Sequence, residues 1–412
     1  MIQMKLGELV AHRNKRNSNI EVLRILSVFL IIAHHFAVHS GFNFGNSSNF
    51  NAIFVDLLNF GGGVGINCLV LISGYFLVKD TRWNFKKIFL LWFRLFVYSV
   101  VLFAVFCLVG KLSFSWKELA KSFVPVMTDD WGYFTSYFVL YLFHPFVNMA
   151  LNNLNKKAYF LMLSLMLLLW SIIPTMAHSE VWKIFIYTLS GNELEAVQLN
   201  RFVWYLFLYC VAGYVQMHVS PQKLNFTPLL VSTIASYVIL FIISITVYVG
   251  FKKGSFYNEM ETLQMFIPSL LLFLTCITAK PRSNKVINFI APSMLGVYLL
   301  HEHGPTTRAY FWRDLFHGTG FAESPYLALY ALGAIVAVFA ICLVIDFAYS
   351  YSVELLLRKG LDTERGEKLC ERFSLDVEPE PVVVEATENH AEEMSGAEQT
   401  AQNTEEKTEA QK

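Results

Sequence analysis

Residues 19–39 read NIEVLRILSVFLIIAHHFAVH, an apolar run that contains an arginine and two adjacent histidines. The hydrocarbon core of a bilayer is roughly 30 Å thick, so a helix needs about 20 residues to cross it. Arg13, Lys15 and Arg16 precede the run, as in a signal peptide, but no small-residue cleavage site follows it. We therefore predict that this run stays in the protein as an anchored transmembrane helix.

Apolar runs of this length recur along the chain. Of its 412 residues, 55% are hydrophobic and 16% are charged, whereas a soluble domain is about 25% charged. This composition excludes an ordinary soluble protein and predicts an all-α, polytopic integral membrane bundle of about ten transmembrane helices. The predicted spans are residues 20–39, 54–78, 88–110, 132–150, 158–178, 202–218, 228–250, 262–279, 286–303 and 325–350.

Lysine and arginine are distributed unevenly over the joints between these spans, and the more basic joints normally stay in the cytoplasm. One set of alternate joints holds 19 of these residues and the other set holds nine. We therefore predict a multi-pass protein of the cell (cytoplasmic) membrane with both termini in the cytoplasm. The more basic joints are residues 1–19, 79–87, 151–157, 219–227, 280–285 and 351–375.

The two ends of the chain differ from its apolar body. Residues 1–19 are predicted to be a cytoplasmic N-terminal segment, 20–350 the transmembrane domain, and 351–375 a basic, amphipathic cytoplasmic segment. Residues 376–412 hold 11 acidic and two basic residues and no aromatic residue, so they cannot bury enough apolar surface to fold alone. We expect them to form a disordered acidic cytoplasmic tail.

Ionisable side chains make the first run the candidate functional helix, because a charge at membrane depth is costly unless it faces the bundle interior or a wet cavity. At about 100° and 1.5 Å per residue, the step from Arg24 to His35 closes almost whole turns and covers roughly 16 Å. Arg24 and His35 therefore share one helix face. His34 lies about 80° off that face, where we expect a helix contact or a supporting role.

The depths of these two side chains in the membrane suggest that they have different roles. Arg24, one turn inside the cytoplasmic end, suits a phosphate group, and His35, deep in the span, suits a general base near neutral pH. A coenzyme A molecule entering from the cytoplasm would have its phosphates low and its thioester high. In the alternative interpretation, Arg24 extends to the lipid headgroups and the histidines hydrogen-bond to neighbouring helices.

A basic joint follows the second span. Such clusters usually enforce topology and bind anionic lipid headgroups, but this one could also hold the phosphates of a nucleotide cofactor. In that second interpretation the cofactor-binding residues are Arg82, Lys86, Lys87 and Arg94. The four glycines within residues 61–65 indicate close helix packing or a local break that lines a cavity.

A third cluster lies at the outer end of the ninth span, where residues 298–305 read YLLHEHGP. Its histidines and its glutamate suit substrate contact or structural hydrogen bonds. Two histidines with one carboxylate between them and no further ligand are a weak metal motif, so no metal is expected. The joint at 301–324 also has aromatic residues, which suit sugar recognition. The candidate substrate-binding residues are His301, Glu302, His303 and Arg308.

Four stretches resemble the acyltransferase 3 family, the bacterial integral-membrane acyltransferases that modify cell-surface polysaccharides and related glycoconjugates. The resemblance covers roughly residues 17–360, and the arginine–histidine pattern of the first helix is its most specific part. The stretches are Arg24-x10-His35, LISGYFLVK at 71–79, TSYFVLYLFHPFVNMAL at 135–151 and SMLGVYLLHEH at 293–303.

The resemblance implies that residues 20–350 are an acyltransferase domain. It implies transfer of an acyl group, usually acetyl, from cytoplasmic acyl-CoA to a hydroxyl of a cell-surface polysaccharide or glycolipid, with Arg24 and His35 as catalytic residues. The expected partners are acyl-CoA, the glycan acceptor and membrane lipids, with no nucleic acid. Because no outer hydrolase-like domain is appended, the resemblance leaves room for a separate extracytoplasmic partner.

Two other functions fit a helical bundle with interior charges. A transporter or flippase of a lipid-linked sugar is the main alternative, but no internal repeat and no paired Gly/Pro-interrupted spans are present. A polysaccharide polymerase or ligase would be expected to carry its polar groups in a large outer loop, whereas the outer joints here run only about twenty residues.

Overall fold

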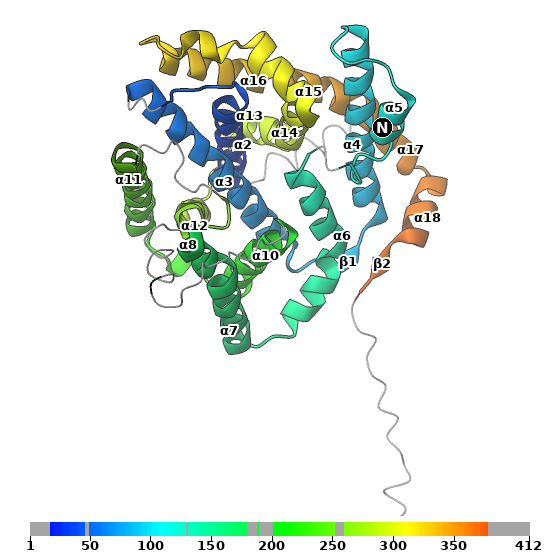
Figure 1. Cartoon of the computed structure of the whole chain (residues 1–412). Helices are drawn as coiled ribbons and strands as arrows, with labels where there is room; N and C mark the ends of the chain where they lie inside the picture. The colour runs from blue at the N-terminus through cyan, green and yellow to red at the C-terminus, as the bar shows by residue number, and fades with distance from the viewer. Residues whose placement is uncertain are drawn as a thin grey trace, which may run out of the picture. The chain divides into compact units, whose positions relative to one another are not determined.

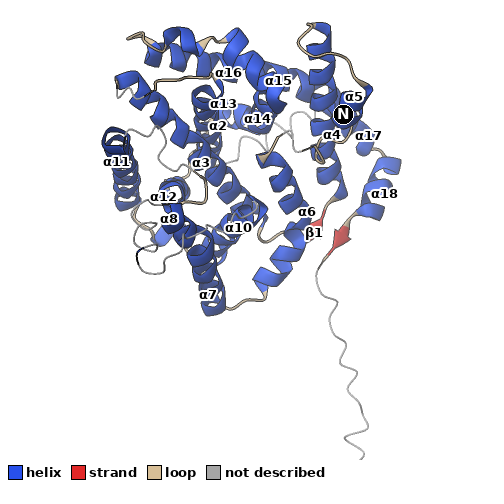
Figure 2. Ribbon diagram, in the orientation of Figure 1, coloured by secondary structure: helices blue, strands red, loops and turns tan. Residues whose placement is uncertain are grey.

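The structure is a computed structural model, and it describes residues 17–45, 49–128, 131–178, 188, 201–251 and 259–377. Most of the predicted N-terminal segment 1–19 and of the predicted tail 376–412 therefore lies outside the described residues. Within those that are described, the regular structure is helical as predicted, apart from one short pair of strands (Figure 2).

Figure 1 shows the elements in chain order by colour. Those before residue 180 are α2 (Ser18–His39), α3 (Phe50–Leu77), β1 (Arg82–Trp83), α4 (Phe85–Leu108), α5 (Trp116–Ser122), α6 (Tyr133–Asn152), α7 (Lys156–Leu167), η1 (Leu168–Ile172) and α8 (Ile173–His178). Those after residue 200 are α10 (Arg201–His218), η2 (Pro221–Lys223), α11 (Phe226–Phe251), α12 (Leu263–Thr278), α13 (Lys285–Ile290), η3 (Ala291–Ser293), α14 (Met294–Glu302), α15 (Gly304–Ala309), η4 (Tyr310–Leu315), η5 (Gly318–Phe321), α16 (Leu327–Tyr349), η6 (Ser350–Glu354), α17 (Leu355–Leu361), α18 (Glu364–Phe373) and β2 (Leu375–Asp376).

Each of the ten predicted spans coincides with helical segments, but only some of these meet both the length and the apolarity needed to cross a bilayer. The ninth predicted span is divided by the tight turn η3, which contains Pro292, and α12 is apolar but short. The chain is thus a polytopic helical membrane protein. Among the described residues, seven segments meet both criteria: Ser18–His39, Phe50–Leu77, Phe85–Leu108, Tyr133–Asn152, Lys156–Met176, Phe226–Ile243 and Leu327–Leu361.

Helix α2 lies at the centre of the packing, in contact with α3, α12, α13, α14, α15 and α16 (Figure 1). Its partner α3 runs antiparallel to it and comes unusually close. A Cβ atom added at Gly65 would lie 2.5 Å from the carbonyl oxygen of Ser27, and one added at Gly61 would overlap the carbonyl of Leu30. These glycines therefore provide the close helix packing that the sequence indicated.

The two ends of α2 contact different parts of the chain. At its first residue, the backbone N–H of Ser18 donates to the carbonyl of Arg282 at 2.7 Å. At its last residue, the carbonyl of His39 accepts from Nε of Arg313 at 3.1 Å. The joint at 280–284 and the joint after residue 303 thus lie at opposite ends of this helix, as expected for joints on opposite sides of a membrane.

The segment after α16 folds back onto the start of α4. Strands β1 and β2 pair antiparallel, with Arg82 opposite Asp376. Leu90 of α4 forms a small apolar cluster with Leu361 and Cys370 of the C-terminal helices. The basic segment predicted over 351–375 therefore packs on the basic joint that follows the second span.

Candidate functional site

A polar cavity of about 470 Å³ lies beside the last turns of α2. We call it the histidine cavity, because three histidines of α2 line it. The surrounding walls come from α3, from the turn before α6, from α10, from the residues before α12 and from α14 and α15. Its lining residues are His34, His35, His39, Asn59, Gly62, Gly63, Ile66, Trp131, Gly132, Tyr133, Arg201, Glu259, Met260, Tyr298, Glu302 and Arg308.

A chain of hydrogen bonds fixes the proton positions on two buried histidines. Nδ1 of His301 lies 2.6 Å from the carbonyl oxygen of Val297, and a carbonyl oxygen can only accept. In neutral His301 the proton is therefore on Nδ1, and Nε2 is an acceptor. Nδ1 of His35 lies 3.0 Å from that Nε2, so it must be the donor. Neutral His35, which lines the histidine cavity, consequently has its unprotonated nitrogen at Nε2.

Glu302 places a carboxylate next to this pair. Its Oε2 lies 3.2 Å from Nδ1 of His35 and 3.8 Å from Nε2 of His39. Its Oε1 pairs with the guanidinium of Arg308 at 2.7 Å. Because Glu302 is only 7% exposed, its interaction with a positively charged imidazole is weakly screened. The carboxylate can therefore stabilise His35 when that residue takes up a proton.

His35, His39 and Glu302 are also the described residues that could hold a metal ion, since one ligand atom from each lies within 4.8 Å of the others. A tetrahedral zinc site has bonds of about 2.1 Å, which brings ligand atoms to roughly 3.4 Å from one another. Arg308 already neutralises Glu302 and would repel a cation. The arrangement suits proton transfer better than metal binding.

A second cavity of about 270 Å³ is lined by Arg24 of α2, whose guanidinium pairs with Glu21 on the same helix at 2.5 Å, together with Lys87 of α4. We call it the arginine cavity. Tyr133 and Tyr298 line both cavities, and their rings meet edge to face with centroids 5.3 Å apart. The arginine cavity and the histidine cavity are therefore neighbours that share an aromatic wall.

The other residues predicted to bind a cofactor lie away from the arginine cavity. Arg82 belongs to β1, and Lys86 forms an ion pair with Asp362. Lys87 alone among the four predicted residues lines this cavity; its side chain is 57% exposed, and its ammonium nitrogen lies 3.5 Å from Oδ2 of Asp80. The structure thus brings Arg24 and Lys87 together, which sequence distance alone did not indicate.

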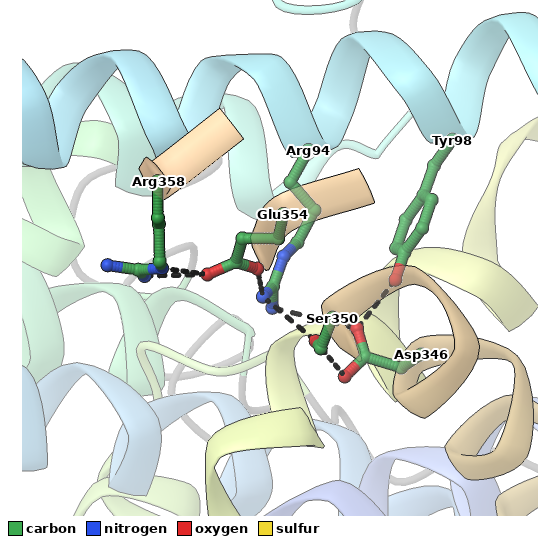
Figure 3. Close-up of polar contacts among 6 residues, drawn as sticks. All are labelled: Arg94, Tyr98, Asp346, Ser350, Glu354 and Arg358. Atoms are coloured by element: carbon green, nitrogen blue, oxygen red, sulfur yellow. Dashed lines mark hydrogen bonds and ion pairs between the residues drawn. The ribbon is translucent and has the colours of Figure 1, made fainter. Parts of the chain in front are cut away.

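Arg94 points into a buried polar network between α4 and the continuous segment formed by the end of α16, η6 and α17 (Figure 3). Its guanidinium pairs with Glu354 and lies 3.6 Å from Asp346, a residue with no exposed side-chain surface. Tyr98 donates to the same Asp346 at 2.5 Å, and Arg358 donates to Glu354 at 2.6 Å. The positive charge of Arg94 is therefore compensated inside the protein, between helices.

The remaining predicted residues lie in different surroundings. Nδ1 of His34 lies 2.8 Å from the carbonyl of Asn59 on α3, which is the helix contact expected of it, and His34 also lines the histidine cavity. His303 points elsewhere, with Nε2 3.3 Å from the hydroxyl of Ser99. Trp312, one of the aromatic residues of the joint at 301–324, has no exposed surface, so its ring cannot stack on a sugar.

Several residues of the site were missed by the sequence reasoning. His39 follows His35 by four residues and so lies on the same helix face, a signal that was present in the sequence. Tyr133 and Tyr298 gave no signal, because a tyrosine in an apolar helix usually packs. Arg201 and Glu259 belong to joints that only the folded chain brings to the cavity.

Comparison with known sequences bears on this site directly. The sequence model of an acyltransferase domain matches residues 17–346. That range includes every residue named above for the two cavities, and the match confirms the resemblance seen in the sequence. No curated protein and no solved structure matches the chain.

Proposed function

The chain belongs to the acyltransferase 3 family, and from this premise we propose that it is a membrane-bound O-acyltransferase. The proposed reaction moves an acetyl group from cytoplasmic acetyl-CoA, or another acyl group from its acyl-CoA, to a hydroxyl of a cell-surface polysaccharide or glycolipid. The observation that carries the proposal is the hydrogen bond that joins His35, at the wall of the histidine cavity, to the fully buried His301.

In this proposal His35 is the general base. An alcohol is a poor nucleophile near neutral pH, so its attack on a thioester needs a group that removes the hydroxyl proton. The unprotonated Nε2 of His35 is available for that step, because Nδ1 is committed to His301 at 3.0 Å. Glu302, 3.2 Å from Nδ1, stabilises the imidazolium that forms.

The proposed transfer balances without a further reactant. The acceptor hydroxyl loses its proton to Nε2 of His35 as its oxygen bonds to the thioester carbonyl carbon. The tetrahedral intermediate then collapses, the carbon–sulfur bond breaks, and the imidazolium returns the proton to the coenzyme A sulfur. The acylated glycan and free coenzyme A leave, and His35 is again neutral.

In this proposal the arginine cavity binds the acyl-CoA donor. Arg24 and Lys87 are cations that suit the phosphates of coenzyme A, and the cavity between them is otherwise lined mainly by aromatic and aliphatic side chains. We propose that the pantetheine arm extends along this cavity toward the Tyr133–Tyr298 wall. Displacement of one of these rings would then bring the thioester to His35.

The orientation follows from the basic joints and is part of the proposal. The Ser18 end of α2 faces the cytoplasm, so the donor enters from there and the acceptor reaches the His39 end from outside. A reporter enzyme that is active only outside the membrane, fused after Lys412, should remain inactive. Strong activity of that reporter would reverse the assignment of the two sides.

The decisive experiment places the purified protein in phospholipid vesicles with radiolabelled acetyl-CoA and surface glycan extracted from the cells that make it. Label should move to the glycan, and His35→Ala should remove this transfer. His317→Ala is a matched control, since His317 is an exposed histidine at the same end of the bundle. Movement of unlabelled glycan across the vesicle without transfer of label would favour a flippase instead.

A further inference from the structure

A third cavity adjoins the histidine cavity near the end of α2. It has a volume of about 280 Å³ and is lined by α2, by the turn that follows it and by the start of α3. Asn59 lines both cavities, and Val38 of this cavity precedes His39 of the other. We call it the phenylalanine cavity, after Phe42 and Phe44. It plays no part in the transfer step described above.

The turn that carries the two phenylalanines has a defined backbone. Gly41 and Gly45 have φ angles of +83° and +56°, a region that favours glycine. Between them, the side chain of Asn43 accepts from the backbone N–H of Gly45 at 3.1 Å, as in an Asx turn. The turn is thus built to a specific shape.

Neighbouring aromatic residues hold the first of these rings. Phe42 packs on Phe36 of α2 with centroids 5.4 Å apart, and Phe36 in turn meets the buried Trp312. Phe44 stacks on Phe42 at 5.6 Å with an interplanar angle of 10°. The result is a pair of nearly parallel rings supported from the bundle core.

Polar groups complete the wall of this cavity. Asp56, which is 8% exposed, and the amides of Asn43 and Asn59 line it together with the two rings. A pyranose ring offers a face of C–H bonds that packs on aromatic rings and an edge of hydroxyls that hydrogen-bond to carboxylate and amide groups. The cavity has both kinds of surface.

We propose that the phenylalanine cavity is a second glycan subsite, which binds the sugar unit next to the one that is acylated. The proposal rests on the proposed function and deepens it: the acceptor is a saccharide chain, held by two adjacent cavities that share Asn59. A monosaccharide could fill only one of them, so chain acceptors should bind more tightly.

The test uses the extracted surface glycan both intact and after mild acid hydrolysis, separated by size into monosaccharides and short chains. With radiolabelled acetyl-CoA, the wild-type protein should show a KM at least roughly tenfold lower for chains than for monosaccharides. Phe44→Ala should lose most of this preference, since an aromatic contact is worth about that factor. Phe44→Tyr should retain it, because the ring face remains.

Two further variants test whether the loss of preference comes from the cavity itself. Val38 lines the cavity and is 40% exposed, so Val38→Phe should fill the cavity without repacking the core and should remove the same preference. Phe50 is a 70% exposed aromatic residue at the start of α3 that does not line the cavity. Phe50→Ala should therefore keep the wild-type ratio of the two KM values.

The outcomes separate this inference from the function on which it rests. Label transfer without any preference for chains, or with a preference that Phe44→Ala and Val38→Phe both retain, would overturn the second subsite alone. Absence of label from every glycan fraction would overturn the proposed function, and the subsite with it.

Discussion

Among the buried ionisable side chains of the described helices, two clusters have similar groups in different surroundings. In the first, Glu302 pairs with Arg308 and lies beside His35. In the second, Arg94 pairs with Glu354 and lies near Asp346 (Figure 3). The first cluster lines the histidine cavity, whereas no side chain drawn in Figure 3 lines either the histidine or the arginine cavity.

The difference shows what distinguishes a reactive intramembrane charge from a structural one. In the Arg94 cluster, each charge has a partner of opposite sign, and the groups connect α4 to the end of α16. In the Glu302 cluster, Nδ1 of His35 donates to His301, and Nε2 of His35 is left without a proton. Burial and ionisation are common to both, so they identify a functional site only when a cavity and an uncommitted atom accompany them.

The largest effect should come from His35→Ala. A positioned general base contributes typically about 10² to 10⁴ in rate, so acetyl transfer should fall by that factor while acetyl-CoA binding stays near normal. His34→Ala should lose less, because its Nδ1 is engaged with Asn59. Initial rates in matched membranes measure both. A fully active His35→Ala protein, or a His34→Ala protein just as inactive, would remove His35 from the role of base.

Arg94→Met should lower the stability of the protein, whereas His35→Ala should lower the rate of acetyl transfer. Removing one partner of a buried ion pair costs about 3–5 kcal/mol, and here Asp346 and Glu354 would lose their shared cation. Unfolding in mixed detergent micelles measures the loss, with Lys86→Met as the control for a more exposed pair. An Arg94→Met protein of normal stability with a raised KM for acetyl-CoA would return Arg94 to the donor site.

Glu302→Gln should lower kcat more than it changes the KM for acetyl-CoA. The carboxylate stabilises only the protonated form of His35, and a hydrogen bond to a charged group is worth about 1.5–3 kcal/mol. We therefore expect roughly a tenfold to hundredfold fall in kcat. Substrate titrations at constant glycan separate the two constants. A tenfold to hundredfold rise in the KM for acetyl-CoA, with kcat unchanged, would mean that Glu302 binds substrate instead of supporting the base.

Lys87→Gln should have the smallest effect, a rise in the KM for acetyl-CoA of about fivefold, which corresponds to the loss of one exposed charge-assisted contact. Higher salt should reduce the difference from the wild type. Lys86→Gln is the matched control, since its neighbour Lys87 lines the arginine cavity and Lys86 does not. If the two variants had the same KM, the basic joint would act through topology and headgroups only.

Local properties of the chain could be predicted from the sequence. Hydrophobic length placed helical segments at all ten predicted spans, and the helix period placed Arg24 and His35 on one face of α2. The fold was less regular than predicted where proline and polar residues interrupt the apolar pattern, as at Pro292. There, residues 285–302 form two helices and a tight turn instead of one span.

The partners of those residues were decided by tertiary structure alone. His301 is 266 residues from His35 in the chain, and no local pattern indicates that α14 will pack on α2 in the register that joins their rings. The same holds for the basic residues: all four predicted cofactor residues look alike in sequence, yet one lines the arginine cavity and another is compensated within a buried network. The physical reason is that the role of a charge depends on the groups across from it, and helix packing determines which groups those are.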